Sequence, residues 1–513
     1  MPARETRVAD EAEKADFSAW MAVAAGTIGA FMATLDASIV NAALPTIQGG
    51  IAASADEGTW ISTSYLVAEI VMIPLAGWFE KIFGLRNFLL LATSLFIGFS
   101  AMCGLSTNLT QMIIGRVGQG FSGGALIPTA LTIVATRLPQ GQRPLGTALF
   151  GLTAVLGPVV GPLVGGWLTE NVSWHYTFFI NVPVGLALIA LIVIAVPGRA
   201  TRLGLLTKAD WLGVVGLSVG LGCLTTLLEE GQRERWFESA FILKLSVVSG
   251  LGFVAMAVGQ FTSRTPIIDL RLLFQKSFGS VFVSSLVVGA ALYGLLYLIP
   301  QFLARVPDYN AEQAGHVALI SGLPSLLIMP FYPLIVRALD IRIVIGSGLL
   351  FYSAGCFYNS GLIPDANGSQ FVTSQILCGF GQALSLLFLN EAATRSVPDE
   401  KTEDASGLFN AGRNLGGSFG LALIKTMLER REDLHTDRIS ESISATSPIA
   451  QDAMNRMAAG EGGMQGALQM LKTTIDLQAE VMAYSDLYFI LGVLMLVGLP
   501  FVPFIRPIPS KAS

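Results

Sequence analysis

The stretch TALFGLTAVLGPVVG, residues Thr147 to Gly161, can be laid without a gap on SGLFNAGRNLGGSFG, residues Ser406 to Gly420. Two leucines, one phenylalanine and two glycines coincide, which indicates an internal repeat. A chance match between helices rich in Gly, Ala and Leu is the alternative. The coincident pairs are Leu149/Leu408, Phe150/Phe409, Leu156/Leu415, Gly157/Gly416 and Gly161/Gly420.

The composition places both copies in a membrane protein. Of the 513 residues, 52% are hydrophobic and 13% are charged, whereas a soluble domain carries about 25% charged residues. Apolar runs of about 20 residues, the length that spans a bilayer, recur along the chain. We predict fourteen spans and hence an all-α integral membrane protein. They begin near Ala19, Gly58, Arg86, Leu109, Arg143, Trp174, Asp210, Ser239, Ser277, Glu312, Ile341, Gly368, Asp404 and Tyr484.

The order of the spans explains the repeat. The first copy lies on the fifth span and the second on the thirteenth, so an even number of spans separates them and the two run in the same direction. Two six-helix bundles with an inserted helix pair account for this offset, and parallel halves around a central site are a plan of secondary transporters. We expect an N-terminal tail (1–18), a first bundle (19–200), the inserted pair (201–262) and a second bundle with a long outer loop (263–513, loop 429–483).

Basic residues predict the orientation. With the N-terminus placed in the cytoplasm, most Lys and Arg fall in inner loops and few in outer ones, as the positive-inside rule requires. Arg233, Arg235 and Arg305 stand against the trend. Both termini are therefore predicted to be cytoplasmic.

Two carboxylates interrupt the apolar spans. Asp36 lies in FMATLDASIVNAALPTI, and Glu69 lies in ISTSYLVAEIVMIPLAG with Tyr65 on its helical face. An acidic residue at a helix centre costs about 2.5–3.5 kcal/mol on an insertion scale, and such residues face the bundle interior or a wet cavity. A lone carboxylate stabilises a bundle poorly. We therefore predict that both carry protons, taken up outside and released inside as a cavity opens alternately to the two sides.

Two arginines lie in other spans: Arg116 in QMIIGRVGQGFSGGALIP and Arg413 in LFNAGRNLGGSFG. They either act in function or pair with carboxylates or carbonyls to hold the halves together. The sequence leaves both interpretations open.

Glycines form a second pattern. In GLTAVLGPVVGPLVGG, the residues Gly157, Gly161 and Gly165 recur every four positions, interrupted by Pro158 and Pro162. Small residues four apart let helix backbones approach closely, and prolines remove backbone donors and bend the helix. The segment is predicted to be a bent helix in close contact with a neighbour.

These motifs resemble the major facilitator superfamily, specifically the fourteen-helix drug:proton antiporters of EmrB/QacA type, over nearly the whole chain. LDASIVNAALPTI is similar to the first-helix signature, GRVGQGFSGG to the fourth-helix motif, GPVVGPLVGG to the fifth-helix antiporter motif and SWHYTFFINVPVG to the sixth-helix signature. Ser122 and His175 stand where a glycine and an arginine are usual. Matching positions are Asp36, Asn41, Pro45, Arg116, Gln119, Gly120, Gly161, Pro162, Gly165, Gly166, Asn181, Pro183 and Gly185.

The resemblance implies a major facilitator fold and export of hydrophobic or amphiphilic toxic compounds, driven by proton entry across a bacterial inner membrane and without a cofactor. It also implies a tripartite pump with a periplasmic membrane-fusion adaptor and an outer-membrane channel. We expect proton coupling by Asp36, Glu69 and Arg116; a substrate cavity with Asn41, Tyr65, Gln119, Asn181, Asn410, Arg413 and Asn414; and an antiporter motif of Gly157, Pro158, Gly161, Pro162, Gly165 and Gly166.

Other functions are kept as alternatives. A dedicated exporter of one metabolite, fatty acid or siderophore would use the same machinery, and a membrane sensor or enzyme could use the fold as a scaffold. The sequence contains no catalytic constellation, metal-ligand spacing or nucleotide-binding motif. Its three histidines, His175, His316 and His435, are far apart.

Two segments raise further expectations. In GWFEKIFGLRNF, where the family has its cytoplasmic loop motif, Lys81 replaces the usual aspartate and Ile82 the usual arginine, which puts the charge latch in doubt; Glu80 is a possible substitute. In the loop 429–483, apolar residues at helical spacing predict an amphipathic helix that runs toward the last span. Those residues are Leu468, Leu471, Ile475 and Met482.

Overall fold

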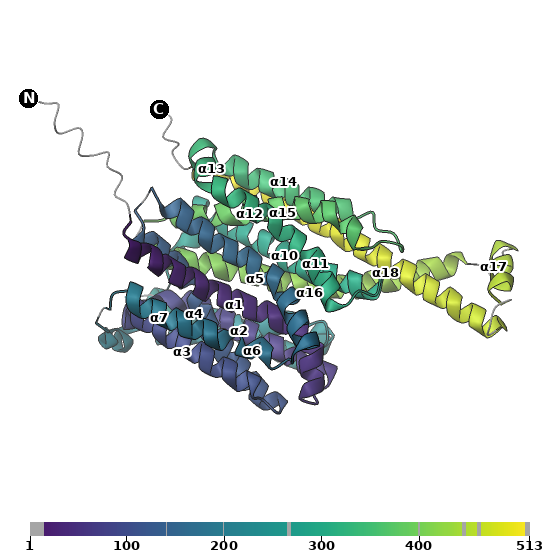
Figure 1. Ribbon diagram of the computed structural model, residues 1–513, viewed down its shortest axis with the longest axis horizontal. Coiled ribbons are helices and arrows are strands. Elements are labelled where there is room, and N and C mark those ends of the chain that lie inside the picture. The colour runs from purple at the N-terminus through teal and green to yellow at the C-terminus, as the bar shows by residue number, and fades with distance from the viewer. Residues whose placement is uncertain are drawn as a thin grey trace, which may run out of the picture.

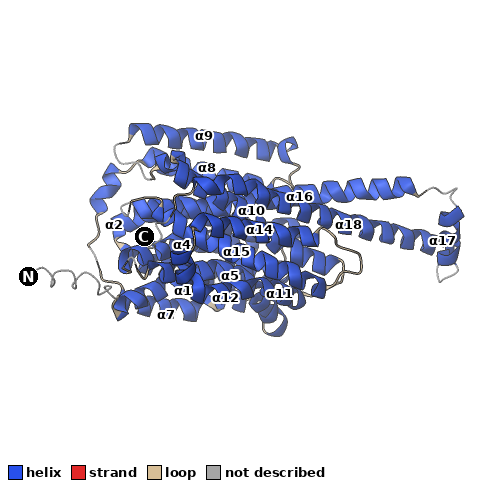
Figure 2. Cartoon of the chain, turned by 90° about the horizontal axis from the view of Figure 1, so that it is seen from above, coloured by secondary structure: helices blue, strands red, loops and turns tan. Residues whose placement is uncertain are grey.

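A computed structural model describes residues 15–507 except 140, 199, 264–267, 399–400, 444–447 and 459–462. Most of the predicted N-terminal tail, residues 1–14, therefore lies outside the described residues. The chain folds into a bundle of long helices, from one end of which a helical hairpin projects (Figures 1 and 2). Helix α1 begins at the opposite end of the bundle, and the last helix ends there too (Figure 1). We call that end the inner end and the hairpin's end the outer end.

The first bundle contains the six predicted spans, the sixth of which consists of two helices. Ser54 and Glu57 form a capping box at the start of the second helix, and Asn108 caps the fourth by accepting a hydrogen bond from the backbone of Gln111. The sixth span is interrupted near Ile180. The helices are α1 (Phe17–Gly50), α2 (Ala55–Phe83), α3 (Leu85–Gly104), α4 (Leu109–Arg137), α5 (Arg143–Asn171), α6 (Tyr176–Phe179) and α7 (Asn181–Ala195).

The second bundle repeats this plan with one span broken by prolines. Pro324, Pro330 and Pro333 each lack a backbone donor, so the tenth span is a chain of short helices rather than one long helix. The elements are η3 (Leu270–Phe274), α10 (Lys276–Arg305), α11 (Ala311–Leu319), η4 (Ile320–Gly322), α12 (Leu323–Ile328), η5 (Met329–Phe331), α13 (Tyr332–Ala338), α14 (Ile341–Asn359), η6 (Gly368–Gln370), α15 (Phe371–Arg395), α16 (Thr402–Ser442), α17 (Pro448–Ala458), α18 (Gly463–Gly498) and η8 (Leu499–Phe504).

The predicted spans fall on these helices, although helix length and apolar character alone do not establish the count of fourteen. Within the described residues, twelve helical segments are long and apolar enough to cross a membrane. Helices α2 and α16 are not among the twelve, yet both belong to the bundle because α2 packs on α4 and α16 on α10. The all-α membrane fold is thus confirmed.

The helix pair between the bundles joins them at the outer end. It comprises η1 (Leu203–Lys208), α8 (Trp211–Glu230), η2 (Trp236–Glu238) and α9 (Ala240–Thr262), and it lies at one side of the bundle (Figure 2). Glu230 accepts a hydrogen bond of 2.8 Å from Thr63 of α2. Glu229 lies 3.8 Å from Lys425 of α16. One end of α8 therefore contacts both halves.

The repeated glycines make the same contact in each half. A Cβ on Gly157 would lie 2.3 Å from Thr34 of α1, and one on Gly416 would lie 2.1 Å from the carbonyl oxygen of Leu286 in α10. The glycines therefore allow α5 to pack on α1 and α16 to pack on α10. The internal repeat describes a real structural equivalence.

The projecting hairpin confirms the predicted helix but corrects its face. Helix α16 has 41 residues and α18 has 36, whereas about 20 residues span a membrane. Both continue beyond the bundle toward α17 (Figure 1). Of the four apolar residues that predicted this helix, Leu468 and Met482 are exposed and Leu471 and Ile475 are half-buried, while Ala467 and Ala479 are buried. Small alanine side chains therefore contribute to the buried face of this helix, and a periodicity of large apolar residues overlooks them.

Candidate functional site

Asp36 lies at the centre of a polar cluster inside the first bundle. Its carboxylate is fully buried and receives hydrogen bonds from three side chains on two other helices. Arg116 Nη1 of α4 donates at 2.7 Å, Gln119 Nε2 at 3.1 Å and Asn181 Nδ2 of α7 at 2.5 Å. The sequence suggested a lone carboxylate, but the structure places Asp36 in a buried ion pair.

Arg116 is held on its other sides as well. Its Nε donates to the carbonyl oxygen of Ile61 at 3.1 Å, and its Cζ lies 4.1 Å from the ring centre of Tyr65. The hydroxyl of Tyr65 donates to the carbonyl oxygen of Ala33 at 3.0 Å. Arg116 therefore joins α1, α2 and α4 within the first bundle, and none of these contacts reaches the second half.

Ser100 of α3 completes the cluster and was missed by the sequence analysis. Its Oγ accepts hydrogen bonds of 2.9 Å from Gln119 and from Asn181 and donates to the carbonyl oxygen of Phe178. A serine in an apolar helix carries no sequence signal for such a role. Asn41 lies apart from this cluster: it is exposed and accepts a hydrogen bond from Ser62 at 2.6 Å.

Glu69 has different surroundings from Asp36. Its side chain is 4% exposed, and no hydrogen bond or ion pair reaches its carboxylate from the described residues. It lies in α2, which packs on α16 of the other half. Arg413, another buried ionisable residue, lies on α16. Glu69 is thus a buried acid at the junction of the halves without a committed partner.

Arg413 is also incompletely paired. Its Nε and Nη2 donate to Asn414 Oδ1 at 3.3 and 3.2 Å, and Tyr293 of α10 donates to the same oxygen at 3.4 Å. Arg413 Nη1, Asn410 Oδ1 and Asn414 Nδ2 are buried without a hydrogen-bond partner among the described residues. The predicted polar residues of α16 therefore each keep an unused buried hydrogen-bonding group.

The antiporter motif binds α5 tightly to α1. A Cβ on Gly161 would lie 2.4 Å from Ser38 Cβ. Because Pro162 has no N–H, the carbonyl of Pro158 lacks its helical donor, and Ser38 Oγ supplies one at 3.0 Å. Gly165 lies against the backbone of Ile39. The carbonyl of Gly166 instead accepts a hydrogen bond of 2.9 Å from Thr169.

We expect Gly161→Ala to lower the free energy of unfolding by about 1–3 kcal/mol, because the added methyl group overlaps α1. Thermal unfolding of the purified protein in detergent measures this change. The matched control is Gly98→Ala in α3, where a Cβ meets no atom within 4 Å. Equal melting temperatures for the two variants would contradict the close contact.

At the inner end, a latch with reversed charge connects the halves. Lys81 at the end of α2 lies 3.5 Å from Asp404 at the start of α16. Asp404 also accepts a hydrogen bond from the backbone N–H of Asp269, whose carboxylate pairs with Lys401. Burial alone would raise the pKa of Asp269, but the hydrogen bond and charge of Lys401 outweigh it and lower that pKa. Lys81, which departs from the family motif, therefore forms an ion pair across the junction of the halves.

Exchanging the two charges tests this latch. Lys81→Asp places two carboxylates at the junction, and we expect export to fall several-fold. Lys81→Asp/Asp404→Lys restores the attraction and should restore most of the rate. A partly exposed pair contributes only about 0.2–1 kcal/mol, which limits the effect. Export assays in a host that lacks other pumps measure both variants. A double variant as impaired as the single one would show that the contact has no such role.

Comparison with known proteins agrees with this architecture. The sequence profile of the Major Facilitator Superfamily matches residues 26–421. The chain belongs to this superfamily. It is 33% identical over 486 residues to the colistin resistance protein EmrB of Acinetobacter baumannii, covering 94% of this chain and 95% of that one. It is 30% identical over 483 residues to the multidrug export protein EmrB of Escherichia coli, covering 94% of both.

Two further matches extend the comparison. The fatty acid resistance protein FarB of Neisseria gonorrhoeae is 29% identical over 493 residues, covering 95% of this chain and 96% of that one. The crystal structure of the human organic anion transporter MFSD10 shares the fold, with a TM-score of 0.59 and 15% identity over 93% of this chain and 99% of that one. The superfamily and the relatives make the protein a multi-pass membrane transporter of the drug-efflux type and not an enzyme.

Proposed function

We propose that the protein exports hydrophobic or amphiphilic toxic compounds in exchange for protons across the bacterial inner membrane. The EmrB relatives, matched over nearly their whole length, support drug export. The observation that carries proton coupling is the contrast between two buried acids. Asp36 is fixed by three donors, whereas Glu69 has no hydrogen-bond donor among the described groups and lies at the junction of the halves.

From this contrast we assign a structural role to Asp36 and proton exchange to Glu69. An ionised carboxylate without donors is costly to bury, so binding a proton or a cationic substrate relieves the cost at Glu69. Proton and substrate then exclude each other at one site, which antiport requires. A proton that moves inward supplies about 2.3 kcal/mol per 100 mV of membrane potential. The Asp36–Arg116 pair keeps α1, α2 and α4 together while the halves move.

Reconstituted vesicles test this function. With the interior representing the periplasm, a proton gradient directed out of the vesicles should drive uptake of a fluorescent lipophilic cation. Collapse of the gradient by a protonophore should stop it. Uptake that does not respond to the gradient would refute proton antiport.

The orientation is part of the proposal. The two ends of the described chain lie at one end of the bundle (Figure 1), and the basic loops predict that this end faces the cytoplasm. A cysteine introduced at Gly204, which is exposed and where a Cβ would meet no atom within 4 Å, should react with a membrane-impermeant maleimide in inside-out vesicles and not in intact spheroplasts. The opposite pattern would reverse the orientation.

The projecting hairpin is the proposed contact for a periplasmic adaptor, which would link the protein to an outer-membrane channel. Met464, Leu468 and Met470 are each more than half exposed on the projecting part of α18, and exposed apolar groups often mark protein contacts. Replacing Met464, Leu468 and Met470 together by serine should abolish copurification with the adaptor. Intact copurification and export would refute the contact.

A dedicated fatty acid exporter is the second candidate, because FarB matches the chain over nearly its whole length. Competition distinguishes the two functions. A fatty acid that inhibits transport of the lipophilic cation without itself being transported favours the drug exporter.

A further inference from the structure

A small cavity of about 30 Å³ lies in the outer half of the second bundle, where α5 of the first bundle packs against it. Its wall is mainly apolar: Leu292 and Ile299 of α10 line it, and so do Val159 and Pro162 of α5. A single water molecule needs about 10–15 Å³ of such space. The small cavity therefore has room for one small chemical group, but not for a whole drug molecule.

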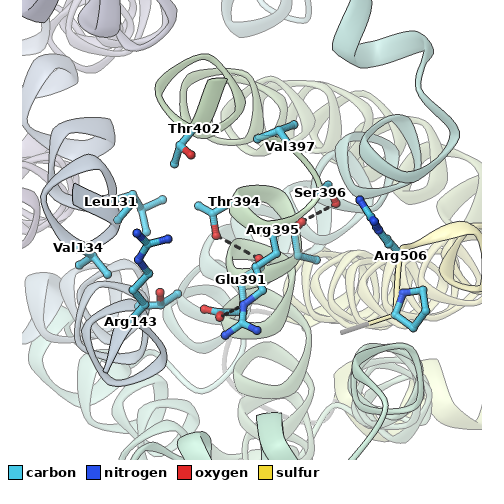
Figure 3. Close-up of a pocket in the computed structure, with 14 residues that line it drawn as sticks. Leu131, Val134, Arg143, Glu391, Thr394, Arg395, Ser396, Val397, Thr402 and Arg506 are labelled. Atoms are coloured by element: carbon cyan, nitrogen blue, oxygen red, sulfur yellow. Dashed lines mark hydrogen bonds and ion pairs between the residues drawn. The ribbon is translucent and has the colours of Figure 1, made fainter. Parts of the chain in front are cut away.

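The wall of the small cavity carries no ionised side chain. None of the described residues that line it is Asp, Glu, Lys, Arg or His. The cavity of about 370 Å³ at the inner end differs, because Arg143, Glu391 and Arg395 are among its lining residues (Figure 3). An ion in the small cavity would be buried without a counter-charge, which costs far more than burying a neutral polar group. The small cavity is thus suited to an uncharged group.

Two glutamines of α15 line the small cavity with unpaired amides. Gln375 is 2% exposed and Gln382 is 3% exposed. The Nε2 atom of each is buried without a hydrogen-bond partner among the described residues, and a buried polar group without a partner is costly. Because rotation about the last side-chain bond exchanges the two ends of an amide, each glutamine can present an N–H donor to the cavity.

The internal repeat relates Gln382 to a residue of the first bundle. Helices α4 and α15 are the fourth and twelfth spans, and so they are separated by the same eight spans as the two copies of the repeat. The pair Gly118–Gln119 of α4 recurs as Gly381–Gln382 of α15. A Cβ on Gly118 would meet Phe99 of α3, and one on Gly381 would meet Tyr352 of α14, the equivalent helix. Gln382 therefore takes the place of Gln119.

The second bundle has no acid to pair with this glutamine. Gln119 donates to Asp36 at 3.1 Å, and Asp36 lies midway between the two α1 residues that contact the repeated glycines. The residue midway between the equivalent contacts in α10 is Val288, which is fully buried. Those contacts are Thr34 and Ser38 in α1 and Leu286 and Ala290 in α10. Gln382 thus lacks the acceptor that its counterpart has, which leaves its amide available to a ligand.

We propose that the amides of Gln375 and Gln382 bind an uncharged hydrogen-bond acceptor of the exported compound, such as the carbonyl of a ketone, ester or amide. This subsite rests on the proposed function, because it adds a required polar group to the class of amphiphilic substrates. A carbonyl receives hydrogen bonds from the amides while the neighbouring carbons contact the apolar wall. A site built to hydrogen-bond such a group discriminates against analogues that lack it.

Two matched probes test this selectivity on the purified full-length protein. The first is hexyltriphenylphosphonium, and the second is the analogue with a ketone on the fifth carbon of the chain, both tritiated. Binding to immobilised protein in neutral detergent, without a gradient, gives both affinities. We expect Gln375→Leu and Gln382→Leu each to weaken the ketone roughly tenfold, as the loss of one buried hydrogen bond implies, and to leave the plain chain unchanged.

Two controls separate this role from a structural one. Leucine is close to glutamine in size and removes an unpaired buried amide, so neither variant should lower the melting temperature. Asn390→Leu removes another buried amide of α15 that does not line the small cavity and should change neither affinity. Equal changes for the two probes, or an unweakened ketone in both glutamine variants, would show that the amides bind water only and would overturn the subsite.

The same assay distinguishes failure of the subsite from failure of the proposed function. Because no gradient is applied, the preference for the ketone stands even if transport proves independent of protons. Plain-chain binding that persists while the glutamine variants lose nothing for the ketone overturns the subsite alone. A wild type that binds neither phosphonium would contradict export of lipophilic cations and, with it, the subsite.

Discussion

Replacing Asp36 by alanine is expected to lower the free energy of unfolding by about 3–5 kcal/mol, because it leaves the guanidinium of Arg116 buried without a counter-charge. Arg116 is 1% exposed, so water cannot compensate for the lost carboxylate. Gln119 and Asn181 would also lose their common acceptor. Thermal unfolding in detergent, followed by intrinsic tryptophan fluorescence, measures the effect.

A second variant separates the ion pair from its burial. Asp36→Leu/Arg116→Met removes both charges and should recover much of the stability, since replacing both partners by apolar groups is often neutral. Glu69→Gln removes a buried charge that has no ion-pair partner in the described structure and should melt close to the wild type. If Asp36→Ala were as stable as the wild type, the ion pair would have no bracing role.

Glu69→Gln should have the largest effect on transport. The amide cannot bind and release a proton, so we expect proton-driven export to fall to the level of empty vesicles while the fold is retained. Transport in reconstituted vesicles, with and without a proton gradient, measures this loss. Glu69 is 4% exposed, and charges interact more strongly in such a place than in water.

Two controls make that result interpretable. Glu57→Gln at the exposed start of α2 changes an acid of the same helix outside the junction and should transport normally. Glu69→Asp keeps the titratable group and should retain partial activity. Full gradient-driven transport by Glu69→Gln would exclude this residue as the proton carrier.

The architecture could be predicted because it depends on sequence patterns that extend over many residues. Apolar runs predicted the membrane-spanning helices but not α17 or the projecting part of α16, and the match between Thr147–Gly161 and Ser406–Gly420 predicted two parallel halves. Glycine spacing predicted the contact of α5, although only the structure shows α1 as its neighbour. Such features repeat over many residues, so a single deviation does not hide them.

The site was only partly predictable, because pairing depends on how helices rotate against each other. The sequence showed Asp36 and Arg116 in separate spans, and only packing brings them to 2.7 Å. Ser100 and Tyr293 join the clusters through one hydroxyl group each, which no periodic pattern marks. Lys81 finds Asp404 in the other half. The sequence therefore does not show which residues, distant along the chain, contact each other.

Proton release on substrate binding tests the central claim most directly. A saturating lipophilic cation is added to purified protein in a weakly buffered solution, and the pH change is recorded. We predict that the wild type and Asp36→Leu/Arg116→Met release protons, whereas Glu69→Gln releases none although it still binds the cation. Undiminished release from Glu69→Gln, or its loss only when the Asp36–Arg116 pair is removed, would contradict the assignment of proton exchange to Glu69.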